Sequence, residues 1–152
     1  MLQFRKHFIL IIGIWVALLL SLSDSNAEGI AFIVNAENPV KVISNQELGD
    51  IFLKKKREWS DGSSIRFIDR KDGSPERNLF LSQYIGRSLR DVELYWIGQK
   101  LYSGNAAPIQ VASDQNAEMM VSSFRGGIAY VSSSYTIGKE VKKITILGNG
   151  VP

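Results

Sequence analysis

The chain has 152 residues and a formal net charge of +3, from 18 Lys and Arg against 15 Asp and Glu. It has no cysteine, and its single histidine, His7, lies close to the N-terminus. Beyond that segment the chain cannot form a disulfide, a thiolate or imidazole metal site, a Ser-His-Asp triad or a Cys-His pair. We therefore expect no cofactor, no metal and no enzymatic activity, and the small net charge does not indicate a nucleic-acid partner.

The N-terminus has the layout of a secretory signal. Arg5 and Lys6 precede an apolar run over residues 8–20, and Ser25-Asn26-Ala27 places small residues at the −3 and −1 positions of a cleavage site. A membrane-spanning helix needs about 20 apolar residues, so the run is short for an uncleaved anchor, which is the alternative. We predict a signal peptide at residues 1–27, localisation to the periplasm, and no stable membrane insertion after cleavage.

Residues 28–152 have the size of one domain with one core, and they contain no repeat or linker. Short apolar runs alternate with amphipathic stretches, such as the one that follows the capping box Ser44-Asn45-Gln46-Glu47. The expected elements in chain order are a strand at 30–34, a helix from Ser44 to Leu53, a turn at 59–63, a strand at 65–69, a helix opened by residues 72–75 and closed by Gly86, a helix from about Ser88, a loop at 104–108, a helix from Asp114, and strands at 128–131 and 141–147. This order predicts an α/β domain with a mixed sheet flanked by helices.

The two C-terminal helices each have an apolar set of side chains. In the helix that starts near Ser88, we expect Val92, Tyr95, Trp96 and Leu101 to be available for burial. In the helix that Asp114 is expected to cap, the apolar residues that keep the helical period are Ala117, Met120, Val121 and Phe124.

One strand-to-helix junction has the chemistry of an anion site. The strand at 65–69 runs into Arg70, Asp72, Gly73 and Ser74, and Arg77 follows in the first turn of the next helix. The start of a helix presents free N–H groups and partial positive charge, and an arginine offers a planar pair of donors to an oxyanion. Asp72 could accept a hydrogen bond from a protonated phosphate, which a sulfate could not provide.

A purely structural explanation of the same junction stays open. Ser74 is a good N-cap, Pro75 is favoured at the first helical position, and Glu76 suits the first turn, so these residues explain a stable helix start without a ligand. Two other polar runs also have two interpretations. Residues 54–57 favour a solvated helix end over a patch for an acidic surface, and residues 132–134 fit oxyanion donors and a polar strand exit equally well.

The order of these motifs resembles the periplasmic phosphate-binding protein of the phosphate ABC transporter, and in particular its short branch. The resemblance rests on Ile51-Phe52-Leu53 ahead of Trp59 and an Asp-Gly turn, then a strand and Arg70-x-Asp72-Gly73-Ser74, then Tyr95-Trp96, Tyr102-x-Gly104 and Gly127-Ile128-Ala129-Tyr130-Val131. It covers roughly Gly29 to Ile146.

The resemblance implies a single periplasmic-binding-protein-like lobe that binds phosphate or a similar oxyanion through Arg70, Asp72, Gly73, Ser74 and Arg77, with a transporter or envelope protein as partner. The sequence departs from the larger members of the family in two ways. Pro75 and Glu76 stand where those members have Gly and Thr, and we expect the chain to start after the N-terminal lobe that supplies the opposite wall of their cleft. Weak binding is therefore expected, and the alternative is an interaction or sensory module that kept the lobe and lost the ligand.

Overall fold

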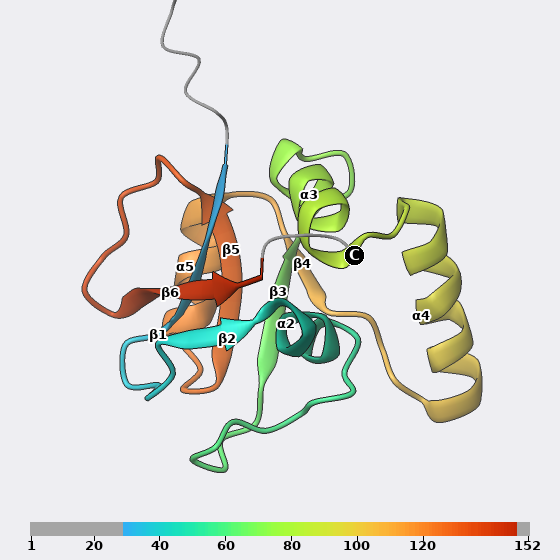
Figure 1. Cartoon of the computed structure of the whole chain (residues 1–152), viewed down its shortest axis with the longest axis horizontal. Coiled ribbons are helices and arrows are strands. Elements are labelled where there is room, and N and C mark those ends of the chain that lie inside the picture. The colour runs from blue at the N-terminus through green and yellow to red at the C-terminus, as the bar shows by residue number, and fades with distance from the viewer. Residues whose placement is uncertain (1–28, 149–152) are drawn as a thin grey trace, which may run out of the picture.

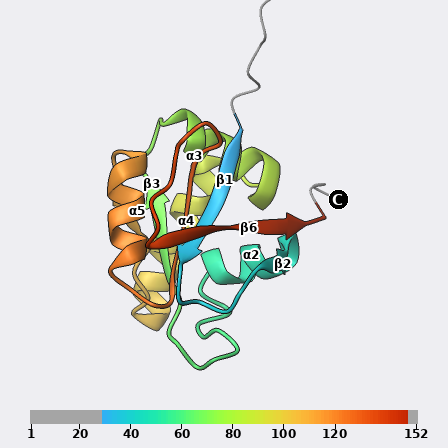
Figure 2. The ribbon, with the colours of Figure 1, turned by 90° about the vertical axis from the view of Figure 1, so that its left-hand side faces the viewer.

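The structure, a computed structural model, describes residues 29–148, so the predicted signal peptide and its cleavage site lie outside the described residues. Among residues 29–148, no helix is long and apolar enough to cross a membrane. The described chain folds into an α/β domain in which helices cover both faces of a mixed sheet (Figures 1 and 2). The predicted fold class is confirmed.

The sheet has six strands among the described residues, in the order β2-β6-β1-β5-β3-β4. The central strand β1 pairs antiparallel with both β5 and β6, whereas β3 lies parallel to β4 and β5, and β2 lies parallel to β6. The strand bounds are β1 Ile30–Asn35, β2 Val42–Ser44, β3 Arg66–Arg70, β4 Ile109–Val111, β5 Gly127–Ser132 and β6 Val141–Leu147. The carboxyl ends of β3, β4 and β5 consequently meet at one edge of the sheet.

The helices begin where their capping residues predict. Ser44, Ser74 and Ser88 each take extended backbone and accept a hydrogen bond from the N–H three residues later, as N-caps do. The helix bounds are α2 Asn45–Phe52, α3 Pro75–Phe80, the π-helix η1 Leu81–Ile85, α4 Leu89–Ser103 and α5 Asp114–Ser122. Gly86 ends η1 in the left-handed conformation, at φ 65°, which a glycine adopts without a Cβ clash.

Alternation along the central strands gives each face of the sheet its own core. Phe32 and Val34 of β1 pack with α2, α3 and α4, whereas Ile33 between them packs with α5. Tyr130 and Ala129 of β5 divide in the same way. Figure 2 shows α5 on one side of the sheet and α2 and α3 on the other. Because successive side chains of a strand point to opposite faces, strands buried on both faces are continuously apolar.

Several predictions were wrong or incomplete. Leu101 is 74% exposed, because α4 buries only Val92 and Trp96 and its C-terminal half extends past the core. Ser113, and not Asp114, caps α5, and Phe124 lies beyond the end of that helix. The three-residue strands β2 and β4 and the π-helix were not predicted, because such short elements carry too few residues to show a period.

Candidate functional site

Arg70 ends β3 at the edge where the carboxyl ends of the parallel strands meet. Its side chain is buried, and its guanidinium forms an ion pair with the carboxylate of Asp114, at the start of α5. A second carboxylate, that of Glu76 in α3, lies 3.6 Å from Nη2, and Nη2 also donates to the carbonyl of Ala112 at 3.5 Å. Nε of Arg70 is buried without a hydrogen-bond partner in the described chain. Two acidic side chains therefore neutralise an arginine that still has one donor to spare.

Arg77 is the second buried arginine, and it turns back toward the sheet. Its Nε donates to Oδ2 of Asp69 at 3.0 Å, and its Nη1 pairs with Asp72. Asp69 is itself only 1% exposed, whereas half of the Asp72 side chain is exposed. Burying a charge is costly unless it is paired, so the Asp69–Arg77 ion pair holds α3 against β3.

Tyr130 completes the hydrogen bonding of Asp69. Its hydroxyl donates to Oδ1 of Asp69 at 2.5 Å, and the Arg70 N–H donates to the same carboxylate oxygen at 2.8 Å. The Tyr130 ring stacks on Phe80 with centroids 4.5 Å apart. Burial, and then the negative charge of Asp69, raise the pKa of Tyr130 well above its ordinary value of 10.0, so the phenol remains a hydrogen-bond donor at every physiological pH.

The turn between β3 and α3 has the conformation that its residues predict. Gly73 has φ +82°, where a side chain would be strained. Ser74 Oγ accepts the N–H of Arg77 at 3.2 Å, and Pro75 occupies the first helical position without needing a partner for an N–H. The purely structural explanation thus accounts for the Ser74 hydroxyl and for Pro75, and Nε of Arg70 remains as a donor without a partner in the described chain.

Asp114 is the site residue that the sequence did not reveal. It was expected to cap α5, but its carboxylate instead bridges the Arg70 guanidinium and the N–H of Ser132, at 3.1 Å, where β5 ends. The predicted polar exit at 132–134 therefore lies at the same edge, with Ser132 Oγ and Ser134 Oγ 2.9 Å apart. No spacing in the sequence links Asp114 to Arg70, because their proximity depends on β3 lying beside both β4 and β5.

The predicted site residues are close in space but do not form an open anion cradle. Arg70 and Arg77 reach in different directions, toward α5 and toward Asp69, and Asp72 bridges Arg77 and Gln110, whose Nε2 donates to it at 3.2 Å. Two buried cations thus meet four carboxylates. This arrangement binds an anion only in competition with the carboxylates of the same chain.

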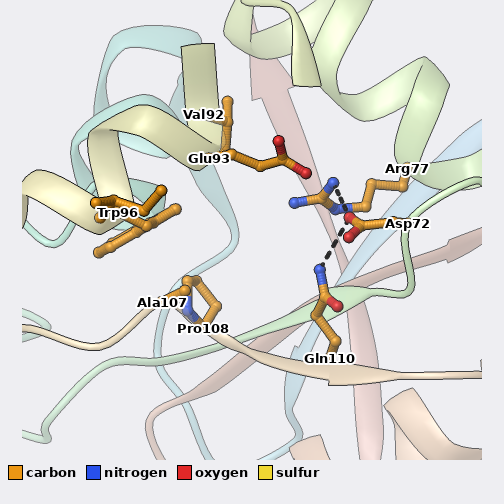
Figure 3. Close-up of a pocket in the computed structure, with 9 residues that line it drawn as sticks. Asp72, Arg77, Val92, Glu93, Trp96, Ala107, Pro108 and Gln110 are labelled. Atoms are coloured by element: carbon orange, nitrogen blue, oxygen red, sulfur yellow. Dashed lines mark hydrogen bonds and ion pairs between the residues drawn. The ribbon is translucent and has the colours of Figure 1, made fainter. Parts of the chain in front are cut away.

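A pocket of about 500 Å³ lies beside this cluster, between α4 and β4. Figure 3 shows Arg77, Asp72, Glu93 and Gln110 at its polar end. The opposite end is apolar and is lined by Val92, Trp96, Ile97, Ala107 and Pro108. Its charged groups are the two carboxylates of Asp72 and Glu93 and the single guanidinium of Arg77, so the pocket does not favour a small dianion.

Comparison with known proteins defines the class to which this architecture belongs. Residues 27–151 match the PBP superfamily domain, and the chain belongs to that family. A search of curated proteins finds no match.

Solved structures of phosphate-transport binding proteins have the same fold. They include a phosphate ABC transporter substrate-binding protein from Clostridium perfringens with bound phosphate (TM-score 0.60, 23% identity, 78% of this chain and 45% of that one). An ABC-type phosphate transport receptor from Vibrio cholerae is similar (TM-score 0.58, 20% identity, 78% of this chain and 46% of that one). PstS from Borrelia burgdorferi is similar as well (TM-score 0.63, 15% identity, 82% of this chain and 49% of that one). The chain spans about half the length of these proteins. Identities this low show a shared fold.

Proposed function

We propose that this protein is an exported, non-enzymatic solute-binding protein that binds phosphate or a related oxyanion weakly, at the edge formed by Arg70, Asp72, Gly73, Ser74 and Arg77. One observation carries the proposal: Arg70 is buried at the end of β3 with Nε unpartnered in the described chain. The fold that this chain shares with phosphate-transport binding proteins supports phosphate as the ligand. Their role supports a periplasmic location and a transporter or envelope protein as partner.

The electrostatics of the site support weak binding. One lobe offers two or three charge-assisted hydrogen bonds of roughly 1.5–3 kcal/mol each, and association costs at least about 4 kcal/mol of lost translational and rotational freedom. A phosphate must also displace Glu76 or Asp114 from Arg70, because both carboxylates already face that guanidinium. The remainder is a few kcal/mol, and about 4.1 kcal/mol corresponds to a millimolar dissociation constant.

Calorimetry with phosphate, arsenate and sulfate tests the proposal on matched variants. The double variant Pro75→Gly, Glu76→Thr should bind phosphate more tightly, because it removes the carboxylate beside Nη2 and adds an N–H donor. Arg70→Lys keeps the charge opposite Asp114 but loses the planar donors, so binding should weaken, and Arg70→Ala should abolish it. Arg125→Ala, at an exposed arginine on another loop, is the control and should change nothing.

Two results would contradict the proposal. Micromolar binding by the unmodified protein would show that the single lobe makes a stronger site than described, and binding unaffected by Arg70→Lys would place the ligand elsewhere. Thermal melts of every variant establish that a loss of binding is not a loss of folding.

A second function, a protein-interaction or sensory module, is favoured by one feature of the same edge. The carboxylates of Asp69, Asp72, Glu76 and Asp114 already balance the charges of both arginines, so the fold does not need an anion to neutralise them. The absence of any heat or thermal shift at millimolar phosphate, also in the Pro75→Gly, Glu76→Thr variant, would favour this function over solute binding.

A further inference from the structure

Helix α4 has apolar side chains on all sides, although only one side is covered. Val92 and Trp96 are buried in the core, whereas Leu94, Ile97 and Leu101 are each more than half exposed, and of these three only Ile97 also reaches the pocket between α4 and β4. A helix that is apolar all round is normally buried on all sides. We call Leu94, Ile97 and Leu101 the outer stripe, and Figure 1 shows α4 at the margin of the molecule, with no other element of the described chain beyond it.

The outer stripe recurs at the helical period. Leu94, Ile97 and Leu101 follow each other at i, i+3 and i+7, which places them in one row along two turns of the helix. Ile109 of the neighbouring edge strand β4 is also more than half exposed. Scattered apolar residues on a surface need no explanation, but a contiguous row of them indicates a binding surface.

The charges beside the outer stripe favour a second copy of the same chain. Glu93 and Lys100 are exposed, lie two turns apart on the same flank of the stripe, and have opposite charges. If two copies of α4 pack antiparallel, Glu93 of each copy lies beside Lys100 of the other, at both ends of the contact. Parallel packing about a two-fold axis would instead place this flank of the two helices on opposite sides of the contact, so the charges of Glu93 and Lys100 would not meet.

Gly98 fits the middle of such a contact. It lies inside α4 next to Ile97, and a Cβ at this position would meet nothing within 4 Å. Glycine in a helix interior destabilises it relative to alanine, so packing within the chain gives no reason for a glycine here. In the antiparallel pair, the Leu94–Leu101 and Glu93–Lys100 pairs are both centred next to Ile97, and Gly98 then lets the two helices approach closely.

We propose that two copies of this protein associate through α4, packed antiparallel about Ile97 and Gly98, with Leu94 of each copy against Leu101 of the other. A two-fold arrangement is self-complementary, so a single surface serves both partners. We call the proposed anion site, formed by Arg70, Asp72, Gly73, Ser74 and Arg77, the Arg70 edge. The association through α4 involves none of these residues, so this proposal is independent of phosphate binding.

Sedimentation velocity of the purified protein over a range of concentrations tests the association. We expect a concentration-dependent dimer, and Ile97→Asp should weaken the association at least about tenfold, because it buries a charge at the centre of the apolar contact. Met119→Asp makes the same kind of change at an exposed apolar residue of α5 and should leave the dimer intact. A protein that is monomeric at every concentration, or a dimer that Ile97→Asp leaves unchanged, would overturn the proposal.

A charge exchange tests the antiparallel geometry. Glu93→Lys alone and Lys100→Glu alone should each weaken the dimer, because like charges then meet at both ends. An equimolar mixture of the two variants should associate again, since every mixed dimer restores opposite charges at both ends. Failure of the mixture to recover would rule out this pairing. Cosedimentation with lipid vesicles that Ile97→Asp abolishes, from a protein monomeric in solution, would assign the outer stripe to a membrane surface instead.

Discussion

The Arg70 edge and the outer stripe of α4 differ in where their partners come from. At the edge, the charges of Arg70 and Arg77 are matched by carboxylates of the same chain. Along α4, three large apolar side chains have no cover within the described chain. A buried charge without a counterion costs several kcal/mol during folding, whereas an exposed leucine costs the monomer little. Buried charges must therefore be paired within the folded chain, whereas an exposed apolar surface can remain uncovered until a partner binds.

The largest effect is expected where a buried charge loses its counterion. Asp69→Asn keeps the shape of the side chain but removes the buried counterion of Arg77 and leaves only the half-exposed Asp72, so we expect it to lower the free energy of unfolding by about 3–5 kcal/mol. Urea denaturation measures this loss. Glu140→Gln, at an exposed ion pair with Lys139, is the control and should be almost neutral. A small effect of Asp69→Asn would mean that the buried Arg77 does not need the negative charge of Asp69.

The Tyr130 hydroxyl should have the next largest effect. Tyr130→Phe removes a buried donor to a carboxylate, and we expect a loss of about 1.5–3 kcal/mol in the free energy of unfolding. Tyr135→Phe removes a hydroxyl that donates to Glu118 at the surface and should cost less. Equal losses from the two variants would contradict the importance of burial at Asp69.

The same tyrosine predicts a dependence on alkaline pH. The folded pKa of Tyr130 is raised above the unfolded value of 10.0, so its stabilising effect is fully present below pH 10. Above pH 10 the unfolded chain releases the proton and the folded chain keeps it, so stability falls by up to about 1.4 kcal/mol per pH unit from this group. Urea denaturation of the unmodified protein and of Tyr130→Phe between pH 9 and pH 11 should show a shallower fall in the variant.

The smallest effect is expected on α4, and it has the opposite sign. In the Ile97→Asp background, which should be monomeric, Gly98→Ala should raise the free energy of unfolding by about 0.5–1 kcal/mol, because alanine favours a helix interior and its Cβ meets nothing. In the otherwise unmodified protein the same Cβ should weaken association. Unchanged association in Gly98→Ala would move the proposed contact away from Gly98.

Local signals in the sequence predicted most of the elements correctly. Ser44, Ser74 and Ser88 cap the helices expected of them, and the strand at 141–147 has the predicted bounds. These features depend on a few neighbouring residues, because a cap bonds to an N–H three positions away and a strand needs only a run of apolar residues. Strand β4 was missed because its three residues are too few to show a pattern.

The sequence by itself determined the α/β class, the starts of α2, α3 and α4, and the closeness of Arg70, Asp72, Gly73, Ser74 and Arg77 along one turn. Tertiary structure alone decided which carboxylates meet the two arginines. Asp114 reaches Arg70, and Tyr130 reaches Asp69, only because β3 lies between β4 and β5 in the sheet. It also decided that Leu101 is exposed, since a helical period shows which residues share a face but not whether anything covers that face.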